Sequence, residues 1–180
     1  MLEDKWLVWK LQMGSDEALQ QIYEKYKGDL LALALALAPD RATAEDALHD
    51  AFVAFAEFAP RLQLRGCLKS YLCSCVANHL RNRGKAKPQH TVGLEQAPLV
   101  AAPQDRPDQS AVAAEESQRL GQALEQLPNL QREVIILHLQ EGLRFKAIAQ
   151  AQEVSINTVQ SRYRYGLEKL RSLLNGKVES

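Results

Sequence analysis

The stretch RFKAIAQAQEVSINTVQSRYRYGLEKLR, residues 144–171, decides the fold of the C-terminal part of this chain. Its apolar spacing predicts a short helix, a tight turn at residues 153–155 and a second helix that runs from there to about residue 174. Ser155 is a good N-cap for the second helix, and Ala149 places a small residue where the two helices must cross closely. This order of elements is the layout of a helix-turn-helix.

The second helix separates into two faces when its residues are placed about 100° apart. Six side chains cluster within about 60° of one another and are predicted to face the core: Ile156, Val159, Tyr163, Leu167, Leu170 and Leu174. The opposite side carries short polar side chains and a tyrosine, with an arginine on each flank: Asn157, Thr158, Ser161, Tyr165, Arg162 and Arg164. Polar groups in the middle can meet base edges, and flanking arginines can hold phosphates or reach guanine. This distribution of residues by itself also fits an amphipathic helix with a solvated outer face, but the turn and the preceding helix favour a role in DNA binding.

The formal net charge of the 180-residue chain is zero, but its charges are unevenly distributed. Residues 1–60 hold five Lys or Arg and eleven Asp or Glu, whereas residues 61–87 hold seven basic residues and no acidic one. Residues 155–180 carry a net charge of +3. Two basic stretches, separated in the sequence from the acidic stretch, indicate that the protein contacts nucleic acid at two sites. A run of like charges is, however, often only a solvated face.

The remaining periodicity is helical rather than alternating, which predicts an all-α protein. In the N-terminal part, helices are predicted over residues 16–37, 44–58 and 68–83, with Thr43 as the N-cap of the second. The apolar run LLALALALA, residues 30–38, falls far short of the ~20 residues of a membrane span and is expected to be a mostly buried helix.

Residues 88–110 contain four prolines and no sustained period, which predicts a flexible linker. Helices are predicted to resume over residues 111–127 and 128–140, and Gly142 stands where a C-cap glycine is expected. The predicted organisation is two small helical domains and the linker between them: residues 1–88, 113–178 and 89–112.

The three cysteines are an odd number, which argues against a secreted disulfide framework. The N-terminus lacks the pattern of a signal peptide, so a cytoplasmic protein without membrane insertion is predicted. On a helix, Cys73 and Cys75 point about 200° apart and cannot both ligate one ion, so no metal or other cofactor is expected. The four histidines show no catalytic spacing, and an enzyme is not predicted.

Five short motifs occur in register across residues 124–171: Leu127-Pro128, Arg132-Glu133-Val134, Glu141-Gly142-Leu143, Ile148-Ala149 and Thr158-Val159-Gln160-Ser161-Arg162. In this order they resemble region 4 of an extracytoplasmic-function (ECF) sigma factor, a member of the sigma-70 family. The N-terminal part resembles region 2 of the same family through a second set of positions: Ala44-Glu45-Asp46, Asp50, Phe52, Tyr71-Leu72 and Asn78. The resemblance implies a protein that binds bacterial core RNA polymerase, at the β′ clamp and the β flap, and directs promoter recognition, −10 melting and transcription initiation.

The resemblance also implies three sets of site residues. Contact with the −35 element would fall to Asn157, Thr158, Gln160, Ser161, Arg162, Arg164 and Tyr165. Contact with the −10 element would fall to Arg65, Lys69, Tyr71, Asn78, Arg81 and Arg83, and Phe58 is near enough to contact unstacked bases. Docking on core polymerase would fall to Glu45, Asp46, His49, Asp50 and Val53.

Three positions depart from the family pattern. His49 replaces a glutamine, Tyr71 stands where tryptophan is frequent, and Glu153 occupies a turn position where glycine is common. A positive φ at Glu153 would cost on the order of 1 kcal/mol. Two other functions remain open from the residues alone, a helix-turn-helix regulator that never joins polymerase and a protein-only adaptor. The resemblance also leaves open whether an anti-sigma factor binds the chain.

Overall fold

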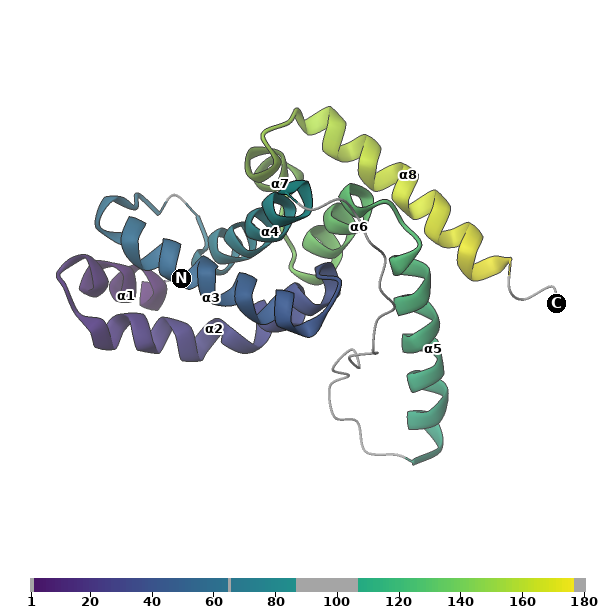
Figure 1. Ribbon diagram of the computed structural model, residues 1–180, viewed down its shortest axis with the longest axis horizontal. Coiled ribbons are helices and arrows are strands. Elements are labelled where there is room, and N and C mark those ends of the chain that lie inside the picture. Colours follow the sequence, from purple (N-terminus) through teal and green to yellow (C-terminus); the bar gives the residue numbers. More distant parts are fainter. Residues whose placement is uncertain (1, 65, 87–106, 177–180) are drawn as a thin grey trace. The chain divides into compact units, whose positions relative to one another are not determined.

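The computed structural model describes residues 2–64, 66–86 and 107–176, and the regular structure of these residues is helical throughout. The prediction of an all-α fold is thereby confirmed. The helices fall into two compact units, Met1–Glu95 and Gln96–Ser180 (Figure 1). Each unit has its own buried core, and each is described separately below.

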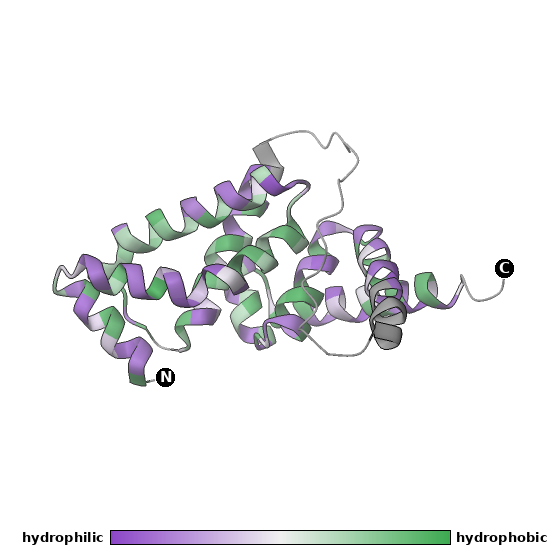
Figure 2. Cartoon of the chain, turned by 90° about the horizontal axis from the view of Figure 1, so that it is seen from below, coloured by the Kyte–Doolittle hydropathy of each residue, from purple (hydrophilic) through white to green (hydrophobic). Residues whose placement is uncertain are grey.

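The N-terminal unit contains α1 (Leu2–Gln12), α2 (Asp16–Leu37), α3 (Arg41–Phe58), the short 3₁₀ helix η1 (Ala59–Arg61) and α4 (Leu68–Ala86). Helices α2, α3 and α4 pack on one another, and α1 lies on α2 and η1. Their apolar sides meet in a core whose largest fully buried members are Ile22, Leu30, Leu33, Phe55, Leu68, Leu72 and Val76. Figure 2 shows the hydrophobic and hydrophilic stretches that recur along these helices.

The apolar run at the end of α2 is part of this core, as predicted. Leu30, Leu33 and Ala34 have no exposed surface, and the residues between and after them are half-buried. Within the described residues, no helix combines the length and the apolar character that a membrane crossing requires.

Two N-terminal features differ from the sequence prediction. Thr43 was expected to cap α3, but the helix begins at Arg41 because Asp40 Oδ1 accepts a hydrogen bond from the backbone N–H of Thr43 at 2.7 Å. An aspartate is a better N-cap than a threonine, so the helix gains its first residues. Helix α1 was not predicted at all, and its hydropathy pattern explains why, since apolar residues occur on both of its sides.

Contacts with α2 hold α1 in place. The phenol of Tyr26 donates a hydrogen bond to Asp4 Oδ1 at 2.7 Å, and Lys25 Nζ lies 2.9 Å from the same oxygen. Leu7 and Val8 are buried beside this carboxylate. Burial of an aspartate is costly unless it is hydrogen-bonded, and these two donors meet that requirement.

The C-terminal unit contains α5 (Pro107–Glu125), α6 (Asn129–Ile135), the π-helical segment η2 (Ile136–Gln140), α7 (Phe145–Gln152) and α8 (Ile156–Asn175). Helix α8 packs against α5, α6 and α7. Helix α5 begins at Pro107, before the predicted start at residue 111, and the predicted helix over residues 128–140 changes from α to π geometry at Ile136. Gly142 has a φ of +68°, as expected of a C-cap glycine.

Candidate nucleic-acid interface

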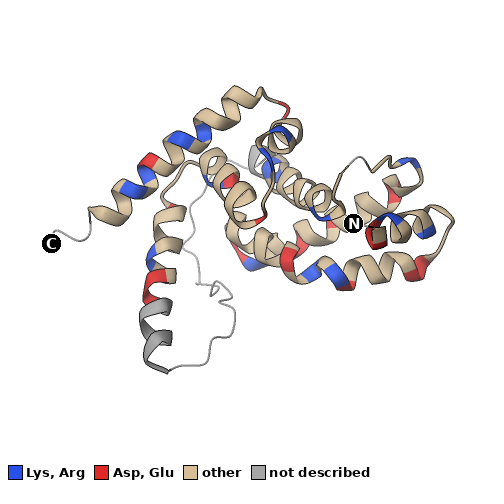
Figure 3. Cartoon of the chain, turned by 180° about the vertical axis from the view of Figure 1, so that it is seen from behind, with Lys and Arg blue, Asp and Glu red and all other residues tan. Residues whose placement is uncertain are grey.

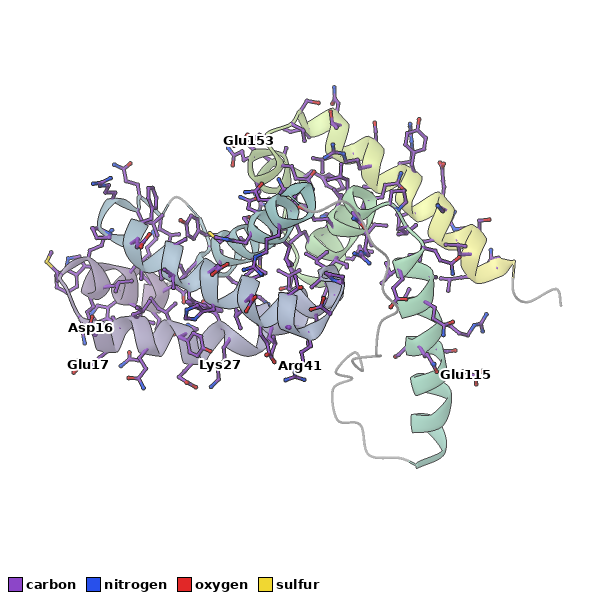
Figure 4. The ribbon with its side chains drawn as sticks, in the orientation of Figure 1. Asp16, Glu17, Lys27, Arg41, Glu115 and Glu153 are labelled. Carbon is purple, nitrogen blue, oxygen red and sulfur yellow. The ribbon has the colours of Figure 1, made fainter. Side chains whose placement is uncertain are left out.

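The turn between α7 and α8 has the geometry that the sequence predicted. Glu153, which Figure 4 labels at this turn, lies in the left-handed region with a φ of 54°. The N–H of Val154 donates to the carbonyl of Ala149 at 3.0 Å. Ser155 Oγ then accepts a hydrogen bond from the backbone N–H of Thr158 at 3.0 Å and so caps α8. The expected cap is confirmed, and Glu153 has the positive φ that the sequence had left open.

A glycine in the middle of α8 brings this helix close to α6. A Cβ atom built on Gly166 would lie 2.8 Å from Ile135 Cδ1 and 3.2 Å from Gln131 Cβ. A side chain there would require Ile135 to turn its terminal methyl group away and Gln131 to shift by a few tenths of an ångström, which favours glycine. Sequence reasoning overlooked this residue, although an isolated glycine inside a helical pattern is itself a signal of close packing.

Three aromatic rings join the segments around the helix-turn-helix. The ring of His138 stacks on that of Phe145 with 4.2 Å between centroids, and Tyr163 approaches both rings edge-on, at 5.0 and 5.2 Å. His138 Nδ1 donates a hydrogen bond to the carbonyl of Leu143 at 2.7 Å, because a carbonyl can only accept. The cluster fixes η2, α7 and α8 relative to one another.

The outer face of α8 carries the predicted −35 residues, and Lys and Arg recur along this helix (Figure 3). Asn157, Gln160, Arg164 and Tyr165 are exposed, and Arg164 lies over the Tyr165 ring at 4.9 Å. Thr158, Ser161 and Arg162 are half-buried. The structure therefore brings all seven side chains to one helix, but with unequal access to a ligand.

Arg162 differs from the other predicted −35 residues in its contacts. Its Nη1 donates a hydrogen bond to Oε1 of Gln152, a buried residue of α7, at 2.6 Å. The predicted contact residue is thus also a link between the two helices of the motif.

The core side of α8 contains one error of prediction. Val159 and Leu170 are buried and Tyr163, Leu167 and Leu174 are half-buried, but Ile156 is 42% exposed. A wheel assigns a residue to a side of the helix, whereas burial also requires a neighbour that extends over it. Ile156 is the first residue of α8, and neighbouring side chains cover it only in part.

The residues predicted to dock on polymerase share the outer face of α3. Glu45, Asp46, His49 and Val53 are exposed and Asp50 is half-buried, at the three- and four-residue spacing of one helix side. Arg41 Nε pairs with Glu45 at 2.7 Å, one turn away on the same helix. The face is therefore mainly acidic and accessible.

The residues predicted to contact the −10 element divide between two sides of α4. Arg83 pairs with Asp46 at 3.1 Å and with Asp50 at 3.0 Å, and Lys69 pairs with Asp29 at 2.8 Å. The hydrogen bond to Asp46 is the main reason why the pKa of Arg83 is raised. These two cations face α2 and α3 rather than the other predicted residues of α4.

The second side of α4 carries Tyr71, Asn78 and Arg81, and Arg81 donates a hydrogen bond to the side-chain oxygen of Asn78. Tyr71 lines an open groove between α3 and α4 together with Ala54, Glu57, Phe58 and Cys75. Burial raises the pKa of Tyr71 to about 12, and its ring lies 6.1 Å from that of Phe55. Arg65, the sixth predicted residue of this set, lies outside the described residues.

The cysteines have different environments. Cys67 is exposed, Cys73 is buried and Cys75 is half-buried, and all three are free thiols. Burial raises the pKa of the Cys75 thiol. Among the described residues, no three His, Cys, Asp or Glu side chains converge as a metal site would require.

Both units match a protein family. Residues 22–87 match "Sigma-70 region 2", and residues 117–170 match "Sigma-70, region 4". The two matches cover 66 and 54 residues, which is 120 of the 180 residues of the chain. The chain belongs to the sigma-70 family of RNA polymerase sigma factors. With its paired regions 2 and 4 it is a sigma factor of the ECF type, a non-enzymatic protein that initiates transcription.

Relatives in other bacteria support this assignment. The chain is 26% identical over 169 residues to the RNA polymerase sigma-H factor of Pseudomonas aeruginosa, which covers 89% of this chain and 88% of that protein. It is 26% identical over 153 residues to the probable RNA polymerase sigma factor RfaY of Xanthomonas campestris pv. campestris, covering 83% of this chain and 38% of that protein.

Solved structures share the fold. CnrH in complex with the cytosolic domain of CnrY is similar with a TM-score of 0.68 and 20% identity, covering 96% of this chain and 97% of that chain. The sigma factor RpoE of Bartonella quintana, in complex with the anti-sigma factor NepR, is similar with a TM-score of 0.65 and 22% identity, covering 87% and 96%.

Proposed function

We propose that this sigma factor holds the −35 element of its promoters with the outer face of α8, chiefly through Asn157, Gln160, Arg164 and Tyr165. The observation that carries the proposal is the polar, exposed side of a helix whose first turn is capped by Ser155 and whose other side packs on α6 and α7. A rigid helix with an accessible polar side suits the major groove of a duplex. Residues 113–178 would form this functional domain, and residues 1–88 the other.

The −10 element would be bound by the side of α4 that carries Tyr71, Asn78 and Arg81. Tyr71 and Phe58 line the same groove, and aromatic side chains beside polar ones suit unstacked bases. Lys69 and Arg83 lie on the other side of α4, in ion pairs with α2 and α3, so we do not place them at the unstacked bases. The groove is therefore the proposed site of strand opening.

Docking on the β′ clamp of core polymerase would use Glu45, Asp46, His49, Asp50 and Val53 of α3. This assignment is supported by the acidic character and the accessibility of the face that they form on α3, which is separate from the side of α4 proposed for DNA. The β flap would meet the C-terminal unit. The protein would act in the cytoplasm, where core polymerase is found.

An anti-sigma factor is a further proposed partner. The similar chain CnrH is seen in complex with the cytosolic domain of CnrY, and the similar chain RpoE in complex with the anti-sigma factor NepR. Exposed apolar side chains of the C-terminal unit, Leu130 and Leu139, offer a surface for such a partner.

Transcription in vitro tests the proposed promoter contacts. The purified chain is mixed with core RNA polymerase and fragmented genomic DNA, and the transcripts are sequenced. We expect discrete start sites that share −35 and −10 elements. A variant with Arg164→Ala and Gln160→Ala should lose starts at promoters that depend on the −35 element, and unchanged starts in that variant would refute the α8 assignment.

A further inference from the structure

Helix α1 carries an exposed apolar stripe. Its members are Leu2, Trp6 and Trp9 of the helix and Met13 in the turn that follows it, which are 87%, 49%, 52% and 69% exposed, and the N–H of Met13 still donates to the carbonyl of Trp9 at 3.1 Å as in a helix. They are spaced four, three and four residues apart, while the opposite side of α1 is buried against α2 and η1. Single exposed apolar residues are ordinary, but a contiguous row that includes both tryptophans of the chain marks an interaction surface.

The spacing of the stripe is that of positions d, a, d and a in a heptad repeat. The stripe is therefore shaped to pair with one other helix of the same kind. In this register Glu3 and Lys10 occupy the e positions on one flank of the stripe, and Lys5 and Gln12 occupy the g positions on the other. The charges of these flanks decide which helix fits.

We propose that the α1 stripe pairs with the α1 stripe of a second copy of this chain, with the two helices antiparallel. In an antiparallel pair the e positions face each other, so Glu3 meets Lys10 of the second copy, twice across the two-fold axis. In a parallel pair, g faces e, and Lys5 would meet Lys10 of the second copy. The charge pattern therefore favours the antiparallel pair and opposes the parallel one.

The existing contacts of these side chains leave room for the pairing. Lys25 Nζ lies 2.7 Å from Glu3 Oε2, and a carboxylate accepts from more than one ammonium group. Lys10 Nζ lies 4.1 Å from the centroid of the Trp6 ring, at the edge of the stripe. Trp6 of one copy would face Trp9 of the other, so four rings would form the centre.

The size of the stripe predicts a weak dimer. An aromatic side chain buries ~150–250 Å², and since the four side chains of each stripe are 49% to 87% exposed, pairing two stripes would bury on the order of 1,000 Å² in total. That is the lower limit of specific interfaces. We therefore expect monomers at low concentration and dimers at high micromolar concentration. The inference does not depend on the proposed promoter contacts.

Sedimentation velocity of the full chain over a wide concentration range tests the proposal. We expect a monomer–dimer equilibrium in the unmodified chain, at least about 10-fold weaker with Trp9→Glu. Since both tryptophans lie in the stripe, their fluorescence emission should move to shorter wavelength as the dimer forms. Leu120→Glu, which changes a residue that is 40% exposed in the C-terminal unit, is the matched control and should leave the equilibrium unchanged.

Charge variants test the orientation. Lys10→Glu should weaken the dimer by about 5-fold through loss of two ion pairs, and the double variant Glu3→Lys, Lys10→Glu should restore it. A chain that stays monomeric throughout, or a dimer that Trp9→Glu leaves intact, would overturn the proposal. A dimer that is insensitive to Lys10→Glu, or not restored in the double variant, would overturn the antiparallel arrangement.

Discussion

Arg162 of α8 donates a hydrogen bond to Gln152 of α7 at 2.6 Å, across the turn of the helix-turn-helix. Gln152 is buried, so its side-chain oxygen depends on this arginine for a partner. A side chain that reads as a DNA contact in the sequence therefore also fixes the angle between the two helices that present the DNA-binding face.

Arg162→Ala should consequently lower stability as well as DNA binding. An unsatisfied buried acceptor costs about 1–3 kcal/mol of unfolding free energy, and the −35 duplex should bind more weakly. Urea denaturation followed by circular dichroism and duplex binding followed by fluorescence anisotropy measure the two effects. Arg164→Ala, at an exposed neighbour, should weaken duplex binding by about 1–3 kcal/mol without loss of stability. Equal stability of the two variants would contradict a structural role for Arg162.

Gly166→Ala should destabilise the C-terminal unit by about 1–3 kcal/mol, because the new methyl group would lie 3.2 Å from Gln131 Cβ and would displace the buried Ile135 side chain, whose Cδ1 lies 2.8 Å away. The matched control is Gly28→Ala in α2, where nothing lies within 4 Å. This control should raise stability by about 0.5–1 kcal/mol, since alanine loses less entropy than glycine in a helix. Thermal unfolding of both variants measures these effects. If Gly166→Ala is as stable as the unmodified chain, Ile135 repacks without cost and the close approach of α6 and α8 does not require glycine.

Glu153→Gly should stabilise the turn by about 1 kcal/mol, because Glu153 has a φ of 54° and glycine adopts that conformation without a Cβ penalty. Glu153→Ala retains the Cβ atom and should give no such gain, which separates backbone strain from loss of charge. Midpoints of chemical denaturation compare the two. If both variants gain equally, the effect is one of charge.

The buried carboxylate of Asp4 should make stability depend on acid pH. Burial alone raises its pKa, but hydrogen bonds from Lys25 and Tyr26 outweigh burial and lower the pKa below its usual value. Its contribution is therefore present above the unfolded pKa of about 4 and is lost as pH falls through the lower, folded pKa. Asp4→Asn should lose about 1–3 kcal/mol at pH 7 and less at pH 3. A difference that stays constant over that range would show that the carboxylate charge does not matter.

Charge reversal at Asp50 should reduce assembly with core polymerase. The variant Asp50→Arg places a cation on the proposed docking face and beside Arg83, while the polar face of α8 is untouched. Co-purification with core polymerase should fall, and binding of the −35 duplex should not. Glu24→Arg breaks a similarly exposed ion pair, with Lys27, and should assemble normally. Normal co-purification of Asp50→Arg would refute the docking face.

Local signals were sufficient for much of this fold. The turn at Glu153, the cap at Ser155 and the long apolar helix before Pro39 each follow from the conformational preferences of a few adjacent residues, and the structure contains all three. The motifs in register across residues 124–171 likewise indicated the sigma-70 family before any contact was known.

Other features depend on residues that are distant in the chain. Helix α1 is held on α2 by the hydrogen bonds of Asp4 and by the buried Leu7 and Val8, and Gly166 matters because Ile135 and Gln131 lie against it. Lys69 and Arg83 share a basic stretch with Arg81 but lie on the other side of α4, and only the packed structure shows that acidic residues of α2 and α3 pair with them there. The amino-acid sequence by itself determined the helices, their caps and the family, since these depend on spacing along one chain segment. Only the tertiary structure decided which side chains are held by neighbours and which remain accessible, because ion pairing and burial are settled between helices.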